Sequence, residues 1–125
     1  MDDHRQTLGA AGEDAALRLY LGRGYQLVAR NWRCRLGELD LVLSRRGVLV
    51  ICEVKARRGG SFGGGWEAVT ARKQAKIRAV SQAFLQLSGA RPQTVRFDVA
   101  SVAMGAHRSA EGPLSAQVEL FEDAF

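Results

Sequence analysis

The chain has 125 residues, the size of one domain, so we expect a single domain over residues 1–125. Hydrophobic residues make up 46% and charged residues 25%, which is typical of a globular protein and excludes a disordered chain. No apolar run approaches the roughly 20 residues of a membrane-spanning helix, and the acidic start does not resemble a secretory signal. We therefore expect a cytoplasmic protein without a membrane partner, with Cys34 and Cys52 as reduced thiols.

The positive charge is concentrated in the middle of the chain. The net charge is +5, yet residues 30–96 alone hold 14 Lys and Arg against four acids. Fifteen of the 18 basic residues are arginines, whose forked guanidinium group suits phosphate. A concentrated basic stretch favours a polyanionic partner, most simply nucleic acid. A solvated basic face is the alternative that charge alone leaves open.

The first half of the chain predicts one helix followed by three strands. Apolar spacing predicts a helix over residues 5–22, with Gly24 as a plausible end signal. Alternation predicts strands at 25–30, 38–45 and 48–55, and Arg46-Gly47 joins the last two. The residues expected on the buried stripe of the helix are Leu8, Ala11, Ala15, Ala16 and Leu19.

The second half predicts one long helix and two more strands. A glycine-rich loop at 58–65 precedes the helix, which is predicted over residues 67–88. Strands are predicted at 95–102 and 118–121, separated by a polar loop at 105–113. The face of the helix expected to meet the sheet comprises Val69, Lys73, Ile77, Val80, Phe84 and Leu87. This order of elements predicts an α/β layered domain with a mixed sheet.

Polar residues gather on one side of the predicted hairpin. If the dipeptide 46–47 is a two-residue turn, Asp40 faces Glu53 and Glu38 faces Lys55. Directly opposed residues have Cβ atoms roughly 4.5–5.5 Å apart. The opposite side is wholly apolar and is predicted to be core, with Leu39, Leu41, Leu43, Val48, Val50, Cys52 and Val54.

Two carboxylates at such a distance predict a bound cation. Asp40 and Glu53 would repel each other and raise each other's pKa unless a cation lies between them. Oxygen ligands suit Mg²⁺ or Mn²⁺, and Glu38 is then a ligand of a second ion or a support for Lys55. The alternative is a set of surface ion pairs, in which Glu38 pairs with Lys55 and Asp40 with a nearby arginine.

The spacing of these residues resembles a known nuclease motif. Asp40, twelve intervening residues and then Glu53-Val54-Lys55 fit the PD-(D/E)XK pattern. Further segments of the chain that carry the resemblance are Gly12-Glu13, residues 37–42, residues 53–57, Lys73, residues 96–99 and the final Ala124-Phe125. Together they resemble the YraN-like family of small bacterial predicted endonucleases, related to archaeal Holliday-junction resolvases. The resemblance implies a restriction-endonuclease-like three-layer fold, with a central mixed β-sheet flanked by helices.

The resemblance also implies a role for each residue of the motif. Asp40 and Glu53 would hold Mg²⁺ or Mn²⁺, and the carbonyl of Val54 would be a third oxygen ligand. Lys55 would orient the attacking water or stabilise charge on the phosphate. Glu13 would reach the metal by resemblance, whereas the sequence alone equally permits an ordinary exposed helix acid.

Several basic residues are placed to contact nucleic acid. Arg57 and Arg58 follow the catalytic strand and suit contacts to the phosphate backbone. Lys73 breaks the apolar stripe of the second helix, so its ammonium group could reach a phosphate or the active site. The alternative for Lys73 is a lysine that extends its charge to water at a helix end. Lys76 favours a plain phosphate contact, and Asp98 is interpreted as structural.

These observations favour a metal-dependent endonuclease that acts on DNA, with branched or otherwise structured DNA as a candidate substrate. The main alternative is a nucleic-acid-binding module with weak or no cleavage activity of its own. A third hypothesis is an interaction protein whose acids form only ion pairs. A homodimer is a candidate assembly, because cutting two strands needs two sites.

Overall fold

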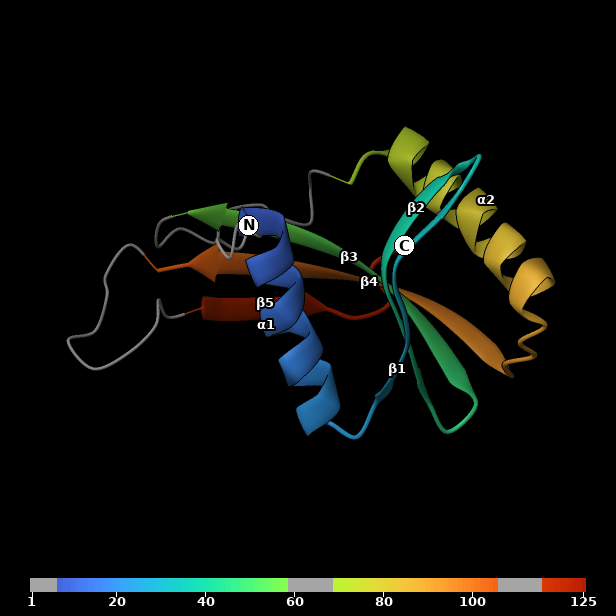
Figure 1. Ribbon diagram of the computed structural model, residues 1–125, viewed down its shortest axis with the longest axis horizontal. Helices are drawn as coiled ribbons and strands as arrows, with labels where there is room; N and C mark the ends of the chain where they lie inside the picture. The colour runs from blue at the N-terminus through green and yellow to red at the C-terminus, as the bar shows by residue number, and fades with distance from the viewer. Residues whose placement is uncertain (1–6, 59–68, 106–115) are drawn as a thin grey trace, which may run out of the picture.

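A five-stranded mixed sheet lies between two helices in the computed structural model, which describes residues 7–58, 69–105 and 116–125 (Figure 1). In chain order the elements are α1 (Leu8–Gly22), β1 (Gln26–Cys34), β2 (Gly37–Arg45), β3 (Val48–Arg58), α2 (Ala71–Ser88), β4 (Thr94–Met104) and β5 (Ala116–Phe121). The expected α/β three-layer fold is confirmed. Of the predicted loops at 58–65 and 105–113, Arg58 lies at the end of β3, and the residues from 59 and from 106 onward lie outside the described ranges.

The strands lie in the sheet in the order in which they occur along the chain, from β1 to β5. β1, β2 and β3 are antiparallel neighbours, β3 and β4 are parallel, and β5 is antiparallel to β4. Parallel neighbours need a long crossover, and α2 lies in the connection between β3 and β4. β1 carries a bulge between Leu27 and Ala29 and is the outer strand beside β2.

The β2–β3 hairpin has the register that the sequence predicts. Arg46 and Gly47 both have positive φ, 48° and 81°, as a two-residue turn matched to twisted strands requires. Pairing runs from Arg45↔Val48 to Leu41↔Cys52. The turn therefore fixes which side chains of the two strands lie beside each other.

Each helix covers one face of the sheet with its own buried cluster. α1 lies over β3, β4 and β5, and the cluster beneath it includes Tyr20, Leu41, Leu43, Val50 and Cys52. α2 lies on the other face, over a cluster that includes Leu39, Val42, Ile51, Ile77 and Val80. Apart from Leu39, the residues predicted to be core on the apolar side of the hairpin pack in the cluster beneath α1. Val42 and Ile51 on the other side are buried as well, because α2 covers that face.

The predicted helix faces are partly wrong. In α1 the buried residues are Gly12, Ala15, Ala16 and Tyr20, whereas Leu19 is only half-buried. α2 begins at Ala71, after the capping residue Thr70, rather than at residue 67. Its buried stripe runs through Ile77, Val80, Ser81 and Phe84 and continues to Leu85, which leaves Leu87 74% exposed. Neither helix, in the part of the chain described, is long and apolar enough to cross a membrane.

Candidate functional site

Strands β2 and β3 separate at Asp40 and leave a fork in the sheet. Their pairing ends at Leu41↔Cys52, and the two strands then diverge (Figure 1). If the β2–β3 pairing continued, the Val54 N–H would donate to the Leu39 carbonyl. Instead, this N–H donates to Asp40 Oδ2 at 2.9 Å. Leu39 remains paired with Trp32 of β1, and Val54 with Ala100 of β4. The Asp40 carboxylate therefore occupies the fork and replaces a backbone partner.

Asp40 and Glu53 lie close together, as the hairpin register predicts. Burial, followed by repulsion from Glu53, raises the pKa of Asp40 to about 7, although the bond from Val54 N–H opposes the shift. Glu53 is itself only 8% exposed. Two acids in a partly dehydrated site are costly, so a cation beside them stabilises the arrangement.

Lys73 supplies such a cation from the first turn of α2. Its Nζ lies 2.9 Å from Glu53 Oε1. The Thr70 hydroxyl accepts the Lys73 N–H at 3.2 Å, which fixes the turn that carries this lysine. Lys73 thus lies against the carboxylate pair, one of the alternatives that the sequence left open for it, and a catalytic role for it stays a prediction.

Lys55 lies beside Lys73 on the polar side of β3. Burial lowers the pKa of Lys55 most, and the neighbouring Lys73 lowers it further. Burial opposes the charge of Lys73 too, but hydrogen bonds with Lys55 and Glu53 outweigh it and raise the pKa of Lys73. Lys73, the lysine in contact with Glu53, therefore holds its proton more strongly than Lys55 does.

A hollow of about 260 Å³ opens at the fork, between β2, β3 and α2. Its lining residues are Glu38, Asp40, Glu53, Lys73, Lys76, Ile77 and Val80. Since Lys55 neighbours Lys73, all three lysines of the chain gather at this site.

Glu38 differs from the predicted arrangement. It forms an ion pair with Arg33 of β1 at 3.0 Å, and within the described segments no ion pair joins it to Lys55. The reason is the fork, because β2 has left β3 before Glu38 could face Lys55. The alternative in which Glu38 and Lys55 form a surface ion pair is therefore wrong for this structure.

Glu13 approaches the same site from α1, and Arg30 holds it there. Arg30 Nε lies 3.1 Å from Glu13 Oε1, and its two other nitrogens bind Asp14 Oδ1 at 2.6 Å and the Ala10 carbonyl at 3.0 Å. The negative charge of Glu13 contributes to the raised pKa of Asp40, which places it near the fork. Arg30 belongs to a segment, 30–32, that also carries the family resemblance, but the sequence assigned it no role, because its partners lie 16 to 20 residues earlier and meet it only through folding.

The oxygen atoms at the fork have the chemistry that a hard divalent ion requires. Asp40 and Glu53 offer two carboxylates, and Glu13 is held by Arg30 instead of joining them. No group of three His, Cys, Asp or Glu side chains forms a potential metal site within the described ranges. A metal held here would therefore have two carboxylate ligands and would need backbone or water oxygens for the rest, an arrangement that Mg²⁺ commonly adopts.

The remaining residues expected to bind nucleic acid differ in their surroundings. Arg57 and Arg58 are the last two residues of β3, beyond Lys55, and Arg58 is exposed. Lys76 is exposed and lines the hollow at the fork. The positions of these three residues leave their predicted role open.

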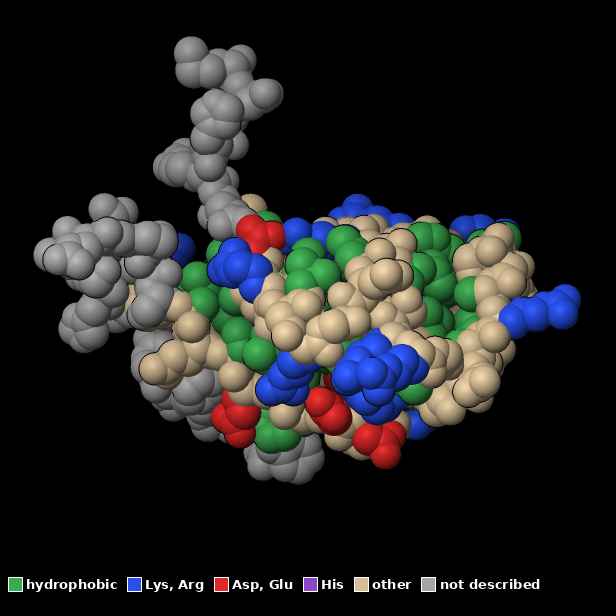
Figure 2. All heavy atoms as spheres, turned by 90° about the horizontal axis from the view of Figure 1, so that it is seen from below, with side chains coloured by type: hydrophobic (Ala, Val, Ile, Leu, Met, Phe, Trp, Pro, Cys, Tyr) green, Lys and Arg blue, Asp and Glu red, His purple; other side chains and the backbone are tan. Residues whose placement is uncertain are grey.

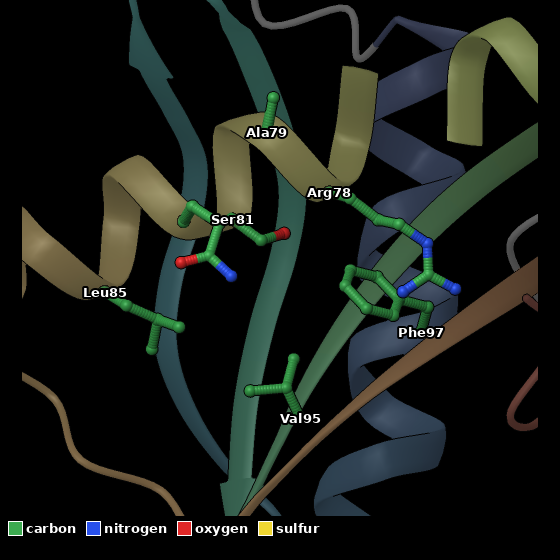
Figure 3. A pocket seen from close by; sticks show the side chains of 7 residues that line it. Arg78, Ala79, Ser81, Leu85, Val95 and Phe97 are labelled. Carbon is green, nitrogen blue, oxygen red and sulfur yellow. The ribbon is translucent and has the colours of Figure 1, made fainter. Parts of the chain in front are cut away.

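Arg78 is engaged elsewhere, at a second hollow of about 420 Å³ (Figure 3). Its guanidinium lies 4.6 Å from the centre of the Phe97 ring and 5.6 Å from that of Phe125. Figure 3 shows Val95 and Leu85 on the other side of this hollow. Among the described residues, no carboxylate lines this larger hollow, in contrast to the hollow at the fork.

The face opposite the fork carries mixed charge. Figure 2 views the protein from below Figure 1, from the side of the β2–β3 turn. Lys and Arg side chains lie there beside Asp and Glu, and uncharged side chains separate such groups. The basic segment of the sequence therefore does not form an unbroken positive surface on this face.

Two buried polar residues of β4 lie outside the predicted catalytic set. Asp98 is fully buried and binds the Tyr20 hydroxyl, the Arg96 guanidinium and the Asp123 N–H, in agreement with its structural interpretation. Ser101 pairs with Lys55 in the sheet, and among the described residues its buried hydroxyl has no hydrogen-bond partner. Nothing in the sequence distinguished Ser101 from other small residues of the strand.

Comparison with known proteins identifies similar chains over nearly the whole length. The sequence model of uncharacterised protein family UPF0102 matches residues 12–102, a range that includes Asp40, Glu53 and Lys73 at the fork. A UPF0102 protein of Rhodococcus jostii is 43% identical over 122 residues, 98% of each chain. A UPF0102 protein of Pelotomaculum thermopropionicum is 41% identical over 125 residues, 100% of both chains. One from a Parafrankia species is 43% identical over 120 residues, 96% of this chain and 97% of its own.

Proposed function

The chain belongs to the uncharacterised protein family UPF0102, and from that premise and its paired carboxylates we propose a metal-dependent nuclease that hydrolyses phosphodiester bonds in DNA. The observation that carries the proposal is the pair formed by Asp40 and Glu53, which burial and mutual repulsion make unfavourable without a cation. The two lysines beside the pair add the positive charge that a phosphate needs. Carboxylates and lysines in one hollow suit hydrolysis of a phosphate ester better than simple ion pairing.

In this proposal Asp40 and Glu53 hold Mg²⁺ or Mn²⁺ together with the carbonyl of Val54. The N–H and C=O of one strand residue point to the same edge, so the Val54 carbonyl faces the fork, as does the N–H bound to Asp40. The bound ion supplies a polarised phosphate and a water of lowered pKa. Glu13, which is paired with Arg30, adds negative charge near Asp40, and this charge favours a bound cation.

Lys55 and Lys73 would act on the phosphate and on the water. Burial and the neighbouring Lys73 lower the pKa of Lys55, so at any given pH a larger fraction of its amine is uncharged than in an ordinary lysine. In this mechanism the uncharged Lys55 amine orients the attacking water and accepts a proton from it. Lys73 remains charged and stabilises the negative charge that grows on the phosphate oxygens.

Arg57, Arg58 and Lys76 would bind the phosphate backbone on either side of the scissile bond. They extend from the end of β3 and from α2, so the DNA would cross the mouth of the hollow. Such contacts position a substrate without reading its bases. Branched or otherwise structured DNA is therefore the substrate class that we propose to test first.

The test compares branched and linear DNA in the presence of Mg²⁺, Mn²⁺ or EDTA, with wild type and two variants. Asp40→Asn keeps an acceptor for the Val54 N–H but removes a carboxylate, so cleavage should fall by at least about 100-fold. Glu119→Gln is the control, because Glu119 is an exposed acid on β5. This variant should cleave DNA like wild type. Cleavage that survives in EDTA or in Asp40→Asn would rule out the proposed site.

A nucleic-acid-binding module with weak or no cleavage of its own is the second candidate. Two observations favour it: among the described residues no third acid joins Asp40 and Glu53 in a potential metal site, and the Lys73 ammonium already forms an ion pair with Glu53. This candidate predicts binding to DNA that weakens steeply with salt, because bound phosphates release counterions. Binding of that kind by both wild type and Asp40→Asn, with no cleavage by either, would favour this candidate over the nuclease.

A further inference from the structure

We propose that the Lys73 ammonium is a displaceable counter-ion, which holds Glu53 in the metal-free protein and moves to the substrate phosphate when a divalent cation binds. The inference rests on the proposed metal site, but it concerns metal and DNA binding and not the cleavage step. It assigns to Lys73 a role that a simple phosphate contact does not have. The role is to couple occupation of the carboxylates to capture of the substrate.

The first step of the argument is that Lys73 and a metal compete for the same carboxylate. Nζ lies 2.9 Å from Glu53 Oε1, and Glu53 is only 8% exposed. A divalent ion bound to both Asp40 and Glu53 would bring a second positive charge within a few ångströms of Nζ. Unit charges about 4 Å apart repel by roughly 1 kcal/mol in water and several-fold more near a protein surface. The ammonium is therefore expected to leave Glu53 when the metal arrives.

The second step is that Lys73 can leave without disturbing α2. The backbone of its turn is fixed by the Thr70 cap, and the preceding Val69 is buried in the cluster beneath the helix. The side chain itself is 38% exposed and lies along the hollow at the fork. A lysine carries its charge on a flexible four-carbon stem, so the ammonium can move while its Cα stays in place.

The third step is that the displaced ammonium stays where a phosphate would bind. The hollow that Lys73 lines also contains Lys76, and of the described carboxylates only Glu38, Asp40 and Glu53 line it. Glu38 is already paired with Arg33. With Asp40 and Glu53 taken by the metal, the phosphate of the substrate is the remaining strong acceptor for Lys73. Metal and DNA should then each strengthen binding of the other, as reciprocal linkage requires.

Direct titration of Mn²⁺ tests the competition. Free Mn²⁺ is measured by electron paramagnetic resonance with wild type, Lys73→Met and Lys76→Met, each first shown to be folded by circular dichroism. Lys73→Met removes the competing charge at similar length, so its Mn²⁺ affinity should rise about tenfold, near the lower end of the effect of a charge in direct contact. Lys76→Met removes an equal charge from the same hollow, and its affinity should change less than about threefold. Unchanged or weaker Mn²⁺ binding by Lys73→Met would overturn the proposal.

Binding to DNA tests the coupling. The affinity for a short duplex is measured by fluorescence anisotropy in EDTA and in Ca²⁺, which has the same charge and ligand preference as Mg²⁺. Lys73→Met should bind like wild type in EDTA, where the ammonium is engaged with Glu53, and at least about fivefold more weakly than wild type in Ca²⁺. An equal loss of affinity in both conditions would show a plain phosphate contact and would contradict the exchange.

The two proposals fail in different ways. Tighter Mn²⁺ binding by Lys73→Met with no DNA cleavage by wild type leaves the counter-ion role standing and removes the nuclease. Metal-dependent cleavage by wild type with unchanged Mn²⁺ affinity in Lys73→Met does the reverse. If neither protein binds Mn²⁺ in the millimolar range, the counter-ion role is overturned as well.

Discussion

At the scale of single residues, Asp40 has two functions that conflict. Its carboxylate replaces a backbone partner for Val54 N–H and so holds the fork together. The same carboxylate is partly buried beside Glu53, which raises its pKa to about 7. A group so far from its ordinary pKa opposes folding when it is charged, and this cost is typical of sites where binding compensates for it.

Replacing Asp40 should therefore stabilise the metal-free protein at high pH. The pKa of Asp40 is about 7 in the folded protein and ordinarily 3.8, so between about pH 4 and 7 its carboxyl is mostly protonated in the folded protein and mostly charged in the unfolded chain. The contribution of this residue to stability is thus greatest below pH 4 and is lost as the pH rises through 7. Asp40→Asn removes the titration, so at pH 8 its free energy of unfolding should exceed that of wild type by about 1–3 kcal/mol.

Urea denaturation in EDTA at pH 5 and pH 8 measures this difference. The gap between Asp40→Asn and wild type should widen from the lower to the higher pH. Added Mn²⁺ at pH 8 should raise the stability of wild type and leave Asp40→Asn nearly unchanged. A gap that does not depend on pH would contradict the raised pKa.

Much of the site could be predicted from the sequence, because it depends on local spacing. The Arg46-Gly47 turn fixes the register, and that register brings Asp40 to Glu53. Lys73 was identified because it interrupts an apolar stripe one turn before Ile77. The partners of Glu13 and Glu38 could not be predicted, since each pairs with an arginine of β1 whose position depends on how α1 and β2 meet that strand.

At the scale of elements, the position of α1 depends on one close approach to β3. A Cβ built on Gly12 would lie 2.5 Å from the Cβ of Ala56, which is closer than real Cβ atoms come. Ala56 directly follows Lys55 in the strand, and Gly12 directly precedes Glu13 in the helix. The missing side chain at residue 12 thus lets the helix bring Glu13 close to β3, the strand that carries Glu53 and Lys55.

Gly12→Ala should push α1 away from β3 even though alanine favours helices. We expect a loss of about 1–3 kcal/mol in the free energy of unfolding, because both contacting groups belong to backbone elements that cannot yield cheaply. Gly9→Ala, one turn earlier in the same helix, meets nothing within 4 Å and should gain about 0.5–1 kcal/mol. Thermal denaturation of both variants measures the difference, and a stable Gly12→Ala would argue against the close packing.

The order and types of the elements were predictable, but the faces they bury were less so. Strands β2 and β3 read as one apolar and one polar side, whereas Val42 and Ile51 on the polar side are buried beneath α2. Leu39 lies in that cluster too, although alternation groups it with Leu41. The divergence of β2 from β3 beyond the Leu41↔Cys52 pair accounts for this change, and no pattern in the sequence predicts that divergence.

At the scale of the whole molecule, Asp98 joins segments that are distant in the chain. Its buried carboxylate accepts hydrogen bonds from Tyr20 of α1 at 2.7 Å and from the Asp123 N–H near the C-terminus at 2.9 Å. Arg96 balances its charge and also donates to the Tyr25 hydroxyl at 3.0 Å. The first helix, the start of β1 and the last residues are thus held to β4 by one network.

Removing this charge should destabilise the protein much more than removing a charge at the surface. Asp98→Asn leaves the mostly buried Arg96 with Glu122, 3.8 Å away and 46% exposed, as its remaining counter-ion, and we expect a loss of about 3–5 kcal/mol. Arg23→Gln breaks an exposed ion pair with Glu122 and should cost less than about 1 kcal/mol. Guanidinium denaturation distinguishes them, and similar losses in both variants would refute the central position of Asp98.

The bulge in β1 has a consequence for how the protein behaves in concentrated solution. An outer strand offers a row of free N–H and C=O groups to any extended chain, and Leu27 and Val28 are 42% and 45% exposed on this one. The extra residue between Leu27 and Ala29 breaks the even spacing of that row, and the positive φ of Asn31 adds a second irregularity. The edge of β1 is therefore not a regular template for a strand of a neighbouring molecule, and this exposed apolar edge should resist the growth of fibrils.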